Sequence, residues 1–179
     1  MKELRMRYVW LTLLLLTVGY ADTIRLPEHF TAHFSQTVTN PKNKVIRYAG
    51  KVAYSRNNLL KWSYTDPTRK EVCTDGKEVL AVDHDLEQTS AYKIDKGFDL
   101  TQILKEAKPY KEHIYVTQYA GKTYTIKLDG KGRLESVAYY DDMDNKIQIL
   151  FKKMQYGKGM LPASIMKCDY PADYDVIRG

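Results

Sequence analysis

The sequence alternates between apolar and polar residues with a period of two over most of its length, and this pattern restricts its fold more than any other feature. Across residues 122–128 one parity is apolar throughout, at Tyr124, Ile126 and Leu128. Asp129-Gly130 follows, and a second alternating run covers residues 134–140. Two such runs joined by an Asp-Gly turn predict an antiparallel hairpin.

Further runs of this kind are separated by Asn, Gly, Asp or Pro, and they cover residues 45–54, 59–65, 71–74, 79–82, 112–119 and 147–156. Many short antiparallel strands at close spacing are typical of a barrel or a strongly curved sheet. No linker, repeat or low-complexity stretch interrupts the pattern. We therefore expect one mainly β domain.

One segment has a helical period instead. Its apolar residues follow the i, i+3, i+4, i+7 spacing of an amphipathic helix, at Leu100, Ile103, Leu104 and Ala107. Asp99 is a good N-cap and Pro109 stops the helix, so we predict a helix over residues 99–108. A weaker helical pattern covers residues 26–34. Periodicity alone predicts a curved sheet with one helix packed on it, and it leaves open whether the concave side is filled or hollow.

The N-terminal residues have the three-part form of a secretory signal peptide. Lys2, Arg5 and Arg7 precede an apolar run over residues 8–18, and the small-residue site Gly19-Tyr20-Ala21 follows. A membrane anchor is the less favoured alternative, because a spanning helix needs roughly 20 apolar residues. We expect cleavage after Ala21, a single domain over residues 22–179, and a location outside the cytoplasm.

Charge and cysteine content narrow the function and the compartment. The chain has a net charge of +6, but its basic residues are dispersed among acidic and apolar ones. This distribution does not form a nucleic-acid-binding stripe. Cys73 and Cys168 could form a disulfide bond in an oxidising compartment, or remain as two buried thiols, and the sequence leaves both states open.

Patterns that would indicate catalysis are weak. His29 and His33 have the i, i+4 spacing of a metal pair, but no third ligand follows at a suitable distance. Asp83-His84-Asp85 places a base between two carboxylates, yet neighbours on a strand point to opposite faces. The nucleophile-elbow, P-loop and Gly-rich dinucleotide motifs are absent from the sequence. We expect a non-enzyme without a metal or cofactor.

The stretch from Tyr54 to Gln88 carries a family signature. It reads YSRNNLLKWSYTDP and then EVCTDGKEVLAVDHDLEQ, and it resembles the central motif of the periplasmic lipoprotein carrier family, LolA. The matching positions are Arg56, Leu60, Trp62, Tyr64, Pro67, Asp75, Gly76, Asp83, Leu86 and Gln88. Phe-Ser-Gln-Thr-Val at 34–38 and the segment 171–177 extend the resemblance over most of the chain after residue 30.

The resemblance implies an incomplete antiparallel β-barrel with short α-helices as a lid over a hydrophobic cavity. Leu60, Trp62 and Tyr64 share one parity and are then expected to line that cavity, as is the apolar helix face of Leu100, Ile103 and Leu104. By their pattern alone, the strand residues would be ordinary core. The resemblance favours the cavity, most clearly for Leu60.

Arg56 is expected to control the lid. The resemblance implies that its side chain donates hydrogen bonds to backbone carbonyls of the lid helices, a task that suits the rigid guanidinium fork. A surface arginine with no such role is the plainer alternative. The chain departs from the family pattern at Asn57, where the family usually has Pro. It also departs before Phe30, where the family's first helix is commonly longer.

The function that the resemblance implies is transport of acylated lipoproteins through the periplasm. Such a carrier takes lipoproteins from an inner-membrane ABC-type release complex and delivers them to an outer-membrane acceptor, and we expect it to act as a monomer. Two alternatives remain. The cargo could be another amphiphile such as a glycolipid, or the chain could be a protein-binding periplasmic domain with a filled core.

Overall fold

The computed structural model describes residues 24–93 and 99–178, which form a twelve-stranded sheet with two short helices. The strands are β1 (His29–Thr39), β2 (Val45–Ser55), β3 (Leu59–Asp66), β4 (Lys70–Thr74), β5 (Glu78–Asp83), β6 (Gln88–Lys93), β7 (Lys108–Lys111), β8 (Ile114–Tyr119), β9 (Lys122–Leu128), β10 (Leu134–Tyr140), β11 (Lys146–Gly157) and β12 (Asp175–Arg178). The predicted signal peptide lies outside the described residues.

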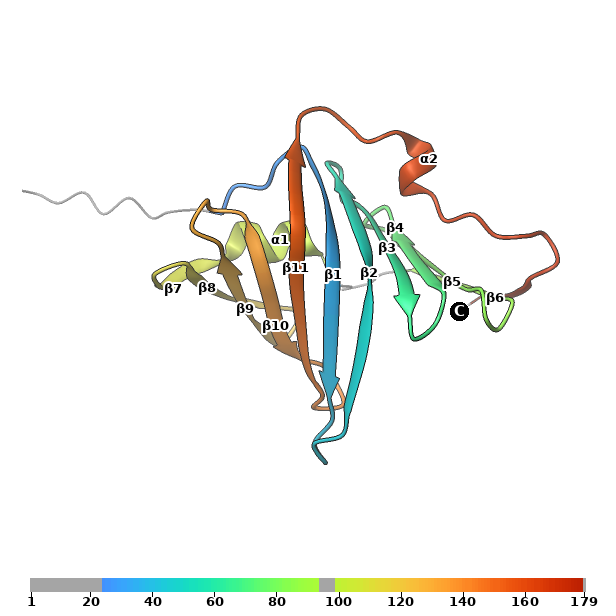
Figure 1. Cartoon of the computed structure of the whole chain (residues 1–179), viewed down its shortest axis with the longest axis horizontal. Helices are drawn as coiled ribbons and strands as arrows, with labels where there is room; N and C mark the ends of the chain where they lie inside the picture. The colour runs from blue at the N-terminus through green and yellow to red at the C-terminus, as the bar shows by residue number, and fades with distance from the viewer. Residues whose placement is uncertain (1–23, 94–98, 179) are drawn as a thin grey trace, which may run out of the picture.

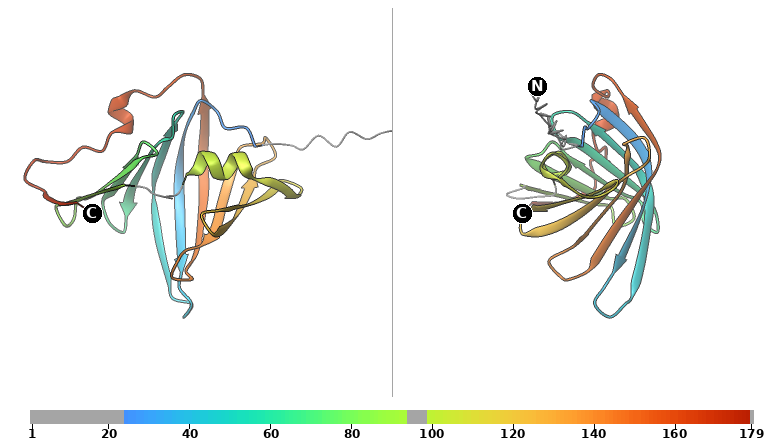
Figure 2. Two further views of the ribbon diagram at one scale, coloured as in Figure 1. Left: turned by 180° about the vertical axis from the view of Figure 1, so that it is seen from behind. Right: turned by 90° about the vertical axis from the view of Figure 1, so that its left-hand side faces the viewer.

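The strand order is β12-β6-β5-β4-β3-β2-β1-β11-β10-β9-β8-β7. Neighbouring strands are antiparallel except β12 and β6, which run parallel. The order ends at β12 on one side and β7 on the other, so the sheet remains open, and it curves around its inner face (Figures 1 and 2). The prediction of a mainly β, strongly curved antiparallel sheet is confirmed.

The inner face of the sheet holds the main apolar core. Alternate residues of the long central strands point inward, because successive side chains on a strand face opposite sides. Aromatic rings meet across these strands: Phe30 and Tyr54 stack with centroids 5.1 Å apart, and Phe34 meets Trp62 edge-on at 4.8 Å. Contacts of this kind stabilise the fold beyond the contribution of the apolar area that each ring removes from water.

Helix α1 (Leu100–Glu106) lies across this inner face (Figure 2, left). The Asp99 side chain caps the helix by accepting a hydrogen bond from the Gln102 backbone N–H at 2.9 Å. The predicted helix over 99–108 is therefore confirmed, although it is shorter at its C-terminal end. Lys108 already belongs to β7, because a residue that precedes proline disfavours the α conformation.

The helix predicted from the weak pattern over residues 26–34 is wrong, since β1 begins at His29 and pairs with β2 and β11 on its two sides. Phe30 and Phe34 fit the strand as well as the helix, and two ladders of backbone hydrogen bonds decide the conformation. Helix α2 (Ala163–Met166) contacts β2 and β3 from the outer face, so within the described residues α1 alone covers the concave side.

The segment after β11 crosses the outer face and ends in β12 (Figure 1). Cys168 of this segment forms a disulfide bond with Cys73 of β4. Around the bond lies a small second apolar cluster with Val82, Leu80 and Tyr174. The C-terminal segment is thus attached covalently to the middle of the sheet, although Cys168 itself lies in a loop and not in a strand.

Candidate functional site

The candidate site is the inner face of β2 and β3 together with α1. Leu60 and Trp62 of β3 are 4% and 8% exposed, and both belong to the main apolar cluster. Trp62 contacts Phe34 of β1 and Phe151 of β11 through its ring. The inward residues of β3, β1 and β11 therefore form one continuous apolar surface, and β2 lies between β3 and β1 in the sheet.

Helix α1 contributes the opposite wall. Leu100, Ile103 and Leu104 are 3%, 0% and 0% exposed and belong to the same cluster as Leu60 and Trp62. The structure thus brings the six predicted ligand-binding residues together, with Tyr64 partly buried at the margin of the cluster. Whether they bind acyl chains stays a prediction.

Tyr64 combines an apolar ring with one polar contact. Its hydroxyl donates a hydrogen bond to Gln36 Oε1 at 3.0 Å, and its ring meets Phe34 edge-on. Burial, and secondarily the neighbouring Tyr48, raise the pKa of Tyr64 to about 12. The hydroxyl therefore remains neutral over the physiological range, and this margin of the apolar surface carries no charge.

Two side-chain hydrogen bonds join α1 to the β2–β3 region. Asn58 Nδ2 donates to Asp99 Oδ2 at 3.3 Å, and Thr101 Oγ1 donates to the Tyr54 hydroxyl at 3.3 Å. Both distances are at the long end for a hydrogen bond. The helix is therefore fixed mainly by apolar contacts, which have no strict directional requirement.

Arg56 lies in the turn between β2 and β3 with its side chain 52% exposed. Its guanidinium forms an ion pair with Glu28 at 3.2 Å, and its backbone N–H donates to the Glu28 carbonyl at 2.8 Å. Glu28 Oε2 also accepts a hydrogen bond from the Gly159 backbone N–H. The contact observed is thus with the segment before β1, whereas the resemblance implied carbonyl groups of the lid helices.

The departure at Asn57 has a backbone explanation. Asn57 and Asn58 have φ angles of +70° and +61°. Asparagine tolerates this left-handed region, and the proline ring, which fixes φ near −65°, cannot adopt it. The turn that places Asn58 beside Asp99 therefore requires a residue other than proline at position 57.

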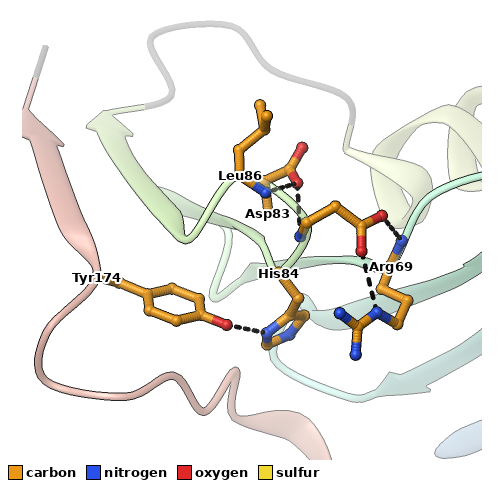
Figure 3. A network of polar contacts seen from close by, with 6 residues as sticks. Arg69, Asp83, His84, Leu86 and Tyr174 are labelled. Atoms are coloured by element: carbon orange, nitrogen blue, oxygen red, sulfur yellow. Dashed lines mark hydrogen bonds and ion pairs between the residues drawn. The ribbon is translucent and has the colours of Figure 1, made fainter.

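The sequence Asp83-His84-Asp85 forms structural contacts in a turn (Figure 3). Asp83 Oδ1 accepts hydrogen bonds from the two backbone N–H groups of Asp85 and Leu86, both at 3.1 Å. His84 Nδ1 lies 3.2 Å from the Tyr174 hydroxyl, and Asp85 forms an ion pair with Arg69. Each of the three side chains has its own partner, and they do not converge on one point.

The two histidines that share metal-pair spacing both lie on β1 rather than on a helix. His29 Nδ1 is 3.0 Å from the Gly159 carbonyl oxygen, and His33 is exposed on the outer face. Within residues 24–93 and 99–178, no group of three or more His, Cys, Asp or Glu side chains is placed to hold a metal ion.

In the same part of the chain, none of the helices has the length and apolar character needed to cross a membrane.

Several residues of the inner cluster are not among the site residues predicted from the sequence. They include Phe30, Tyr54, Ile126 and Val137, all less than 5% exposed. Their strand parity is visible in the sequence, but parity alone does not tell which face of a strand is the concave one. The position of α1, whose apolar residues share the cluster with these side chains, supplies that information.

Comparison with known proteins supports one family. A sequence profile described as outer membrane lipoprotein carrier protein LolA matches residues 27–105. A protein of Campylobacter jejuni subsp. jejuni named outer-membrane lipoprotein carrier protein is 30% identical over 149 residues, which cover 83% of this chain and 86% of the relative. A protein of Wolinella succinogenes with the same name is 29% identical over 126 residues, or 70% and 73% of the two chains.

Among solved structures, an uncharacterized conserved protein from Thermus thermophilus has a similar fold. It superposes with a TM-score of 0.55 at 13% sequence identity, over 86% of this chain and 92% of that one. At this identity the similarity shows a common fold alone.

Proposed function

Since the chain belongs to the LolA family of outer membrane lipoprotein carrier proteins, we propose that it is a periplasmic carrier that binds the acyl chains of lipoproteins and delivers them to the outer membrane. The proposal includes an inner-membrane ABC-type complex as the donor and an outer-membrane protein as the acceptor. The carrier acts as a monomer and needs no catalytic group, metal or cofactor, because its work is binding and release.

The observation that carries the proposal is the apolar inner face covered by one seven-residue helix. Each buried methylene contributes about 0.8 kcal/mol, so a three-chain lipid anchor with some 40 methylenes would cost about 30 kcal/mol to expose to water. A soluble carrier must supply an apolar surface of comparable size. The inner face of this sheet offers a continuous apolar surface to which both β3 and α1 contribute.

Binding requires α1 to move. Leu100, Ile103 and Leu104 are almost fully buried against the sheet, so acyl chains can reach the inner face when the helix lifts away. The chains then replace apolar contacts of the helix with apolar contacts of their own. Exchange between similar contacts has a small net free energy, which suits a carrier that must also release its cargo.

Arg56 fits this mechanism as a residue that acts through the β2–β3 turn. Its ion pair with Glu28 anchors the turn, and Asn58 of the same turn donates a hydrogen bond to Asp99, the N-cap of α1. We propose that Arg56 favours the closed position of α1 through this chain of contacts. Loss of the arginine should shift the population toward the open, ligand-bound form and slow cargo release.

The experiment that tests the proposal is native mass spectrometry of the protein purified from the periplasm, followed by transfer of an acylated lipoprotein to outer membranes. The expected result is a one-to-one complex with lipoprotein and transfer that depends on the carrier. A complex with a glycolipid and no lipoprotein transfer would instead favour a carrier of another amphiphile. A protein without bound amphiphile and without transfer activity would contradict the proposal and favour a protein-binding domain.

A further inference from the structure

The outer face of the sheet has a cavity of about 490 Å³ beneath α2. Its floor is formed by two adjacent rows of outward-facing residues, one with Thr31, Ala53 and Lys61 side by side, and the other with His33, Lys51 and Ser63. These residues have the opposite parity to Phe30 and Phe34 of the inner core. The cavity is therefore separated from the candidate site by the sheet itself.

A bulge in β11 completes one wall. The pairing of β1 with β11 shifts register between Thr31 and His33, and Lys153 lies opposite this point with a φ angle of +53°. Lys153 and Gln155 line the cavity, and Ser164 and Ile165 of α2 form its cover. The C-terminal segment is held over the sheet by the bond between Cys168 and Cys73, which pairs with Lys61 at the opposite side of the cavity.

The cavity is positively charged. Three lysines, Lys51, Lys61 and Lys153, line it, and its lining includes no aspartate or glutamate among the described residues. Lys61 is already neutralised, because its Nζ is 2.9 Å from Glu71 Oε1, and it also donates to the Lys167 carbonyl at 2.7 Å. Lys51 and Lys153 have no acidic partner within the part of the chain that the structure describes.

We propose that this outer cavity binds a phosphate group that carries a small organic body. A phosphate monoester has a charge of about −1.5 to −2 at neutral pH, which matches the two unpaired lysines. Lysine is a common phosphate ligand, and the hydroxyls of Thr31, Ser63 and Ser164 add short hydrogen-bond donors. The volume lies within the range of small-molecule sites, about 300–1,000 Å³, and leaves space beyond the phosphate itself.

The phosphate group has two sources: a soluble phosphate monoester, and the phosphodiester head group of an anionic phospholipid, which carries one negative charge rather than nearly two. The inference does not rest on the proposed carrier function, because it concerns the opposite face of the sheet. Binding at this cavity also differs from the general attraction of a basic protein to anions, because it depends on particular lysines. The lysines that matter are Lys51 and Lys153, whereas Lys42 and Lys44 in the β1–β2 turn are equally charged and exposed but do not line the cavity.

The test uses the disulfide-bonded protein and two variants with the same charge change, Lys51→Gln/Lys153→Gln and the control Lys42→Gln/Lys44→Gln. Binding of sn-glycerol 3-phosphate is measured by calorimetry, and binding to phosphatidylglycerol vesicles by co-sedimentation, with phosphatidylcholine vesicles for comparison. We expect the cavity variant to lose about tenfold or more in affinity, because two charge-assisted contacts are removed. The control should change by about twofold or less, as a screened long-range charge effect predicts.

Binding of the soluble ester, lost in the cavity variant, would support the proposal with a soluble ligand. Binding to phosphatidylglycerol vesicles alone, lost in the same variant, would support it with a lipid head group. The proposal is overturned when the unsubstituted protein binds neither probe, when both variants lose affinity equally, or when the cavity variant binds as well as the unsubstituted protein. Thermal unfolding of both variants checks that the fold is retained, as expected for exposed lysines.

Discussion

At the scale of single residues, the two apolar clusters differ in how firmly they are closed. Leu60 on the inner face belongs to the same apolar cluster as α1, which two long side-chain hydrogen bonds join to the β2–β3 region. Val82, which is 0% exposed, lies in the small outer cluster beside the disulfide bond between Cys73 and Cys168. The same substitution at the two positions should therefore have different effects.

Leu60→Glu should weaken acyl-chain binding and leave the fold intact. The carboxylate can be hydrated when α1 lifts away, so we expect a loss of about 1–2 kcal/mol in the free energy of unfolding. Val82→Glu is the matched control, and it should cost about 3–5 kcal/mol because its cover cannot open. Urea unfolding and lipid binding are measured on both. An unfolded Leu60→Glu protein would contradict the movable helix and favour a filled core.

Tyr64 predicts a pH dependence of stability. Its folded-state pKa is about 12 and its unfolded value about 10, so its stabilisation is complete below pH 10 and is lost as pH rises toward 12. Each unit of the difference corresponds to about 1.4 kcal/mol, and the total effect is at most about 3 kcal/mol. Denaturant unfolding between about pH 9 and pH 11 should show this fall, and Tyr64→Phe should reduce it.

At the scale of elements, the C-terminal segment depends on a single covalent attachment. Strand β12 pairs through four residues with one side of β6, and parallel pairing over so short a length is weak. The disulfide bond closes a loop with a sequence separation of 95 residues. The bond is therefore expected to stabilise this segment more than its own pairing does.

Removal of the bond by Cys73→Ala/Cys168→Ala should lower the free energy of unfolding by about 2–5 kcal/mol. The first region to lose protection against hydrogen exchange should be β12, followed by α2. Exchange measured by mass spectrometry on the variant and on the reduced unsubstituted protein checks this, and the two should agree. Unchanged protection of β12 would show that the segment is held by its apolar contacts instead.

The elements also differ in how well the sequence predicts them. Strands 122–128 and 134–140 were predicted with the bounds of β9 and β10, because two-sided pairing imposes clear alternation and an Asp-Gly turn separates them. The short strands β6, β7 and β12, at or next to the two margins of the sheet, are not predicted, since short strands there carry little apolar pattern. The inner residues of the site could be named by parity and family resemblance, but the partner of Arg56 depends on the spatial position of Glu28. The signature contains no information on that contact.

At the scale of the whole molecule, the sheet separates two surfaces. The inner face is apolar and covered by α1, and the outer face carries the basic cavity and the disulfide-linked C-terminal segment. A carrier that moves between membranes requires the inner face to remain shielded from water and the outer face to remain solvated. The disulfide bond on the outer face also requires an oxidising environment when the chain folds.

That requirement connects the fold to the predicted export signal. Produced with residues 1–21, the protein should be recovered from the periplasm with Asp22 as its first residue and without free thiols, because a basic start, a short apolar run and a Gly-Tyr-Ala site direct export and cleavage. Produced from residue 22 onward in a reducing cytoplasm, it should carry two free thiols and unfold at a lower temperature. N-terminal sequencing, thiol titration and thermal unfolding of both preparations provide the comparison. An uncleaved product that sediments with the membrane fraction would show instead that the N-terminal segment is an anchor. The domain, with its apolar inner face, would then be tethered to the inner membrane.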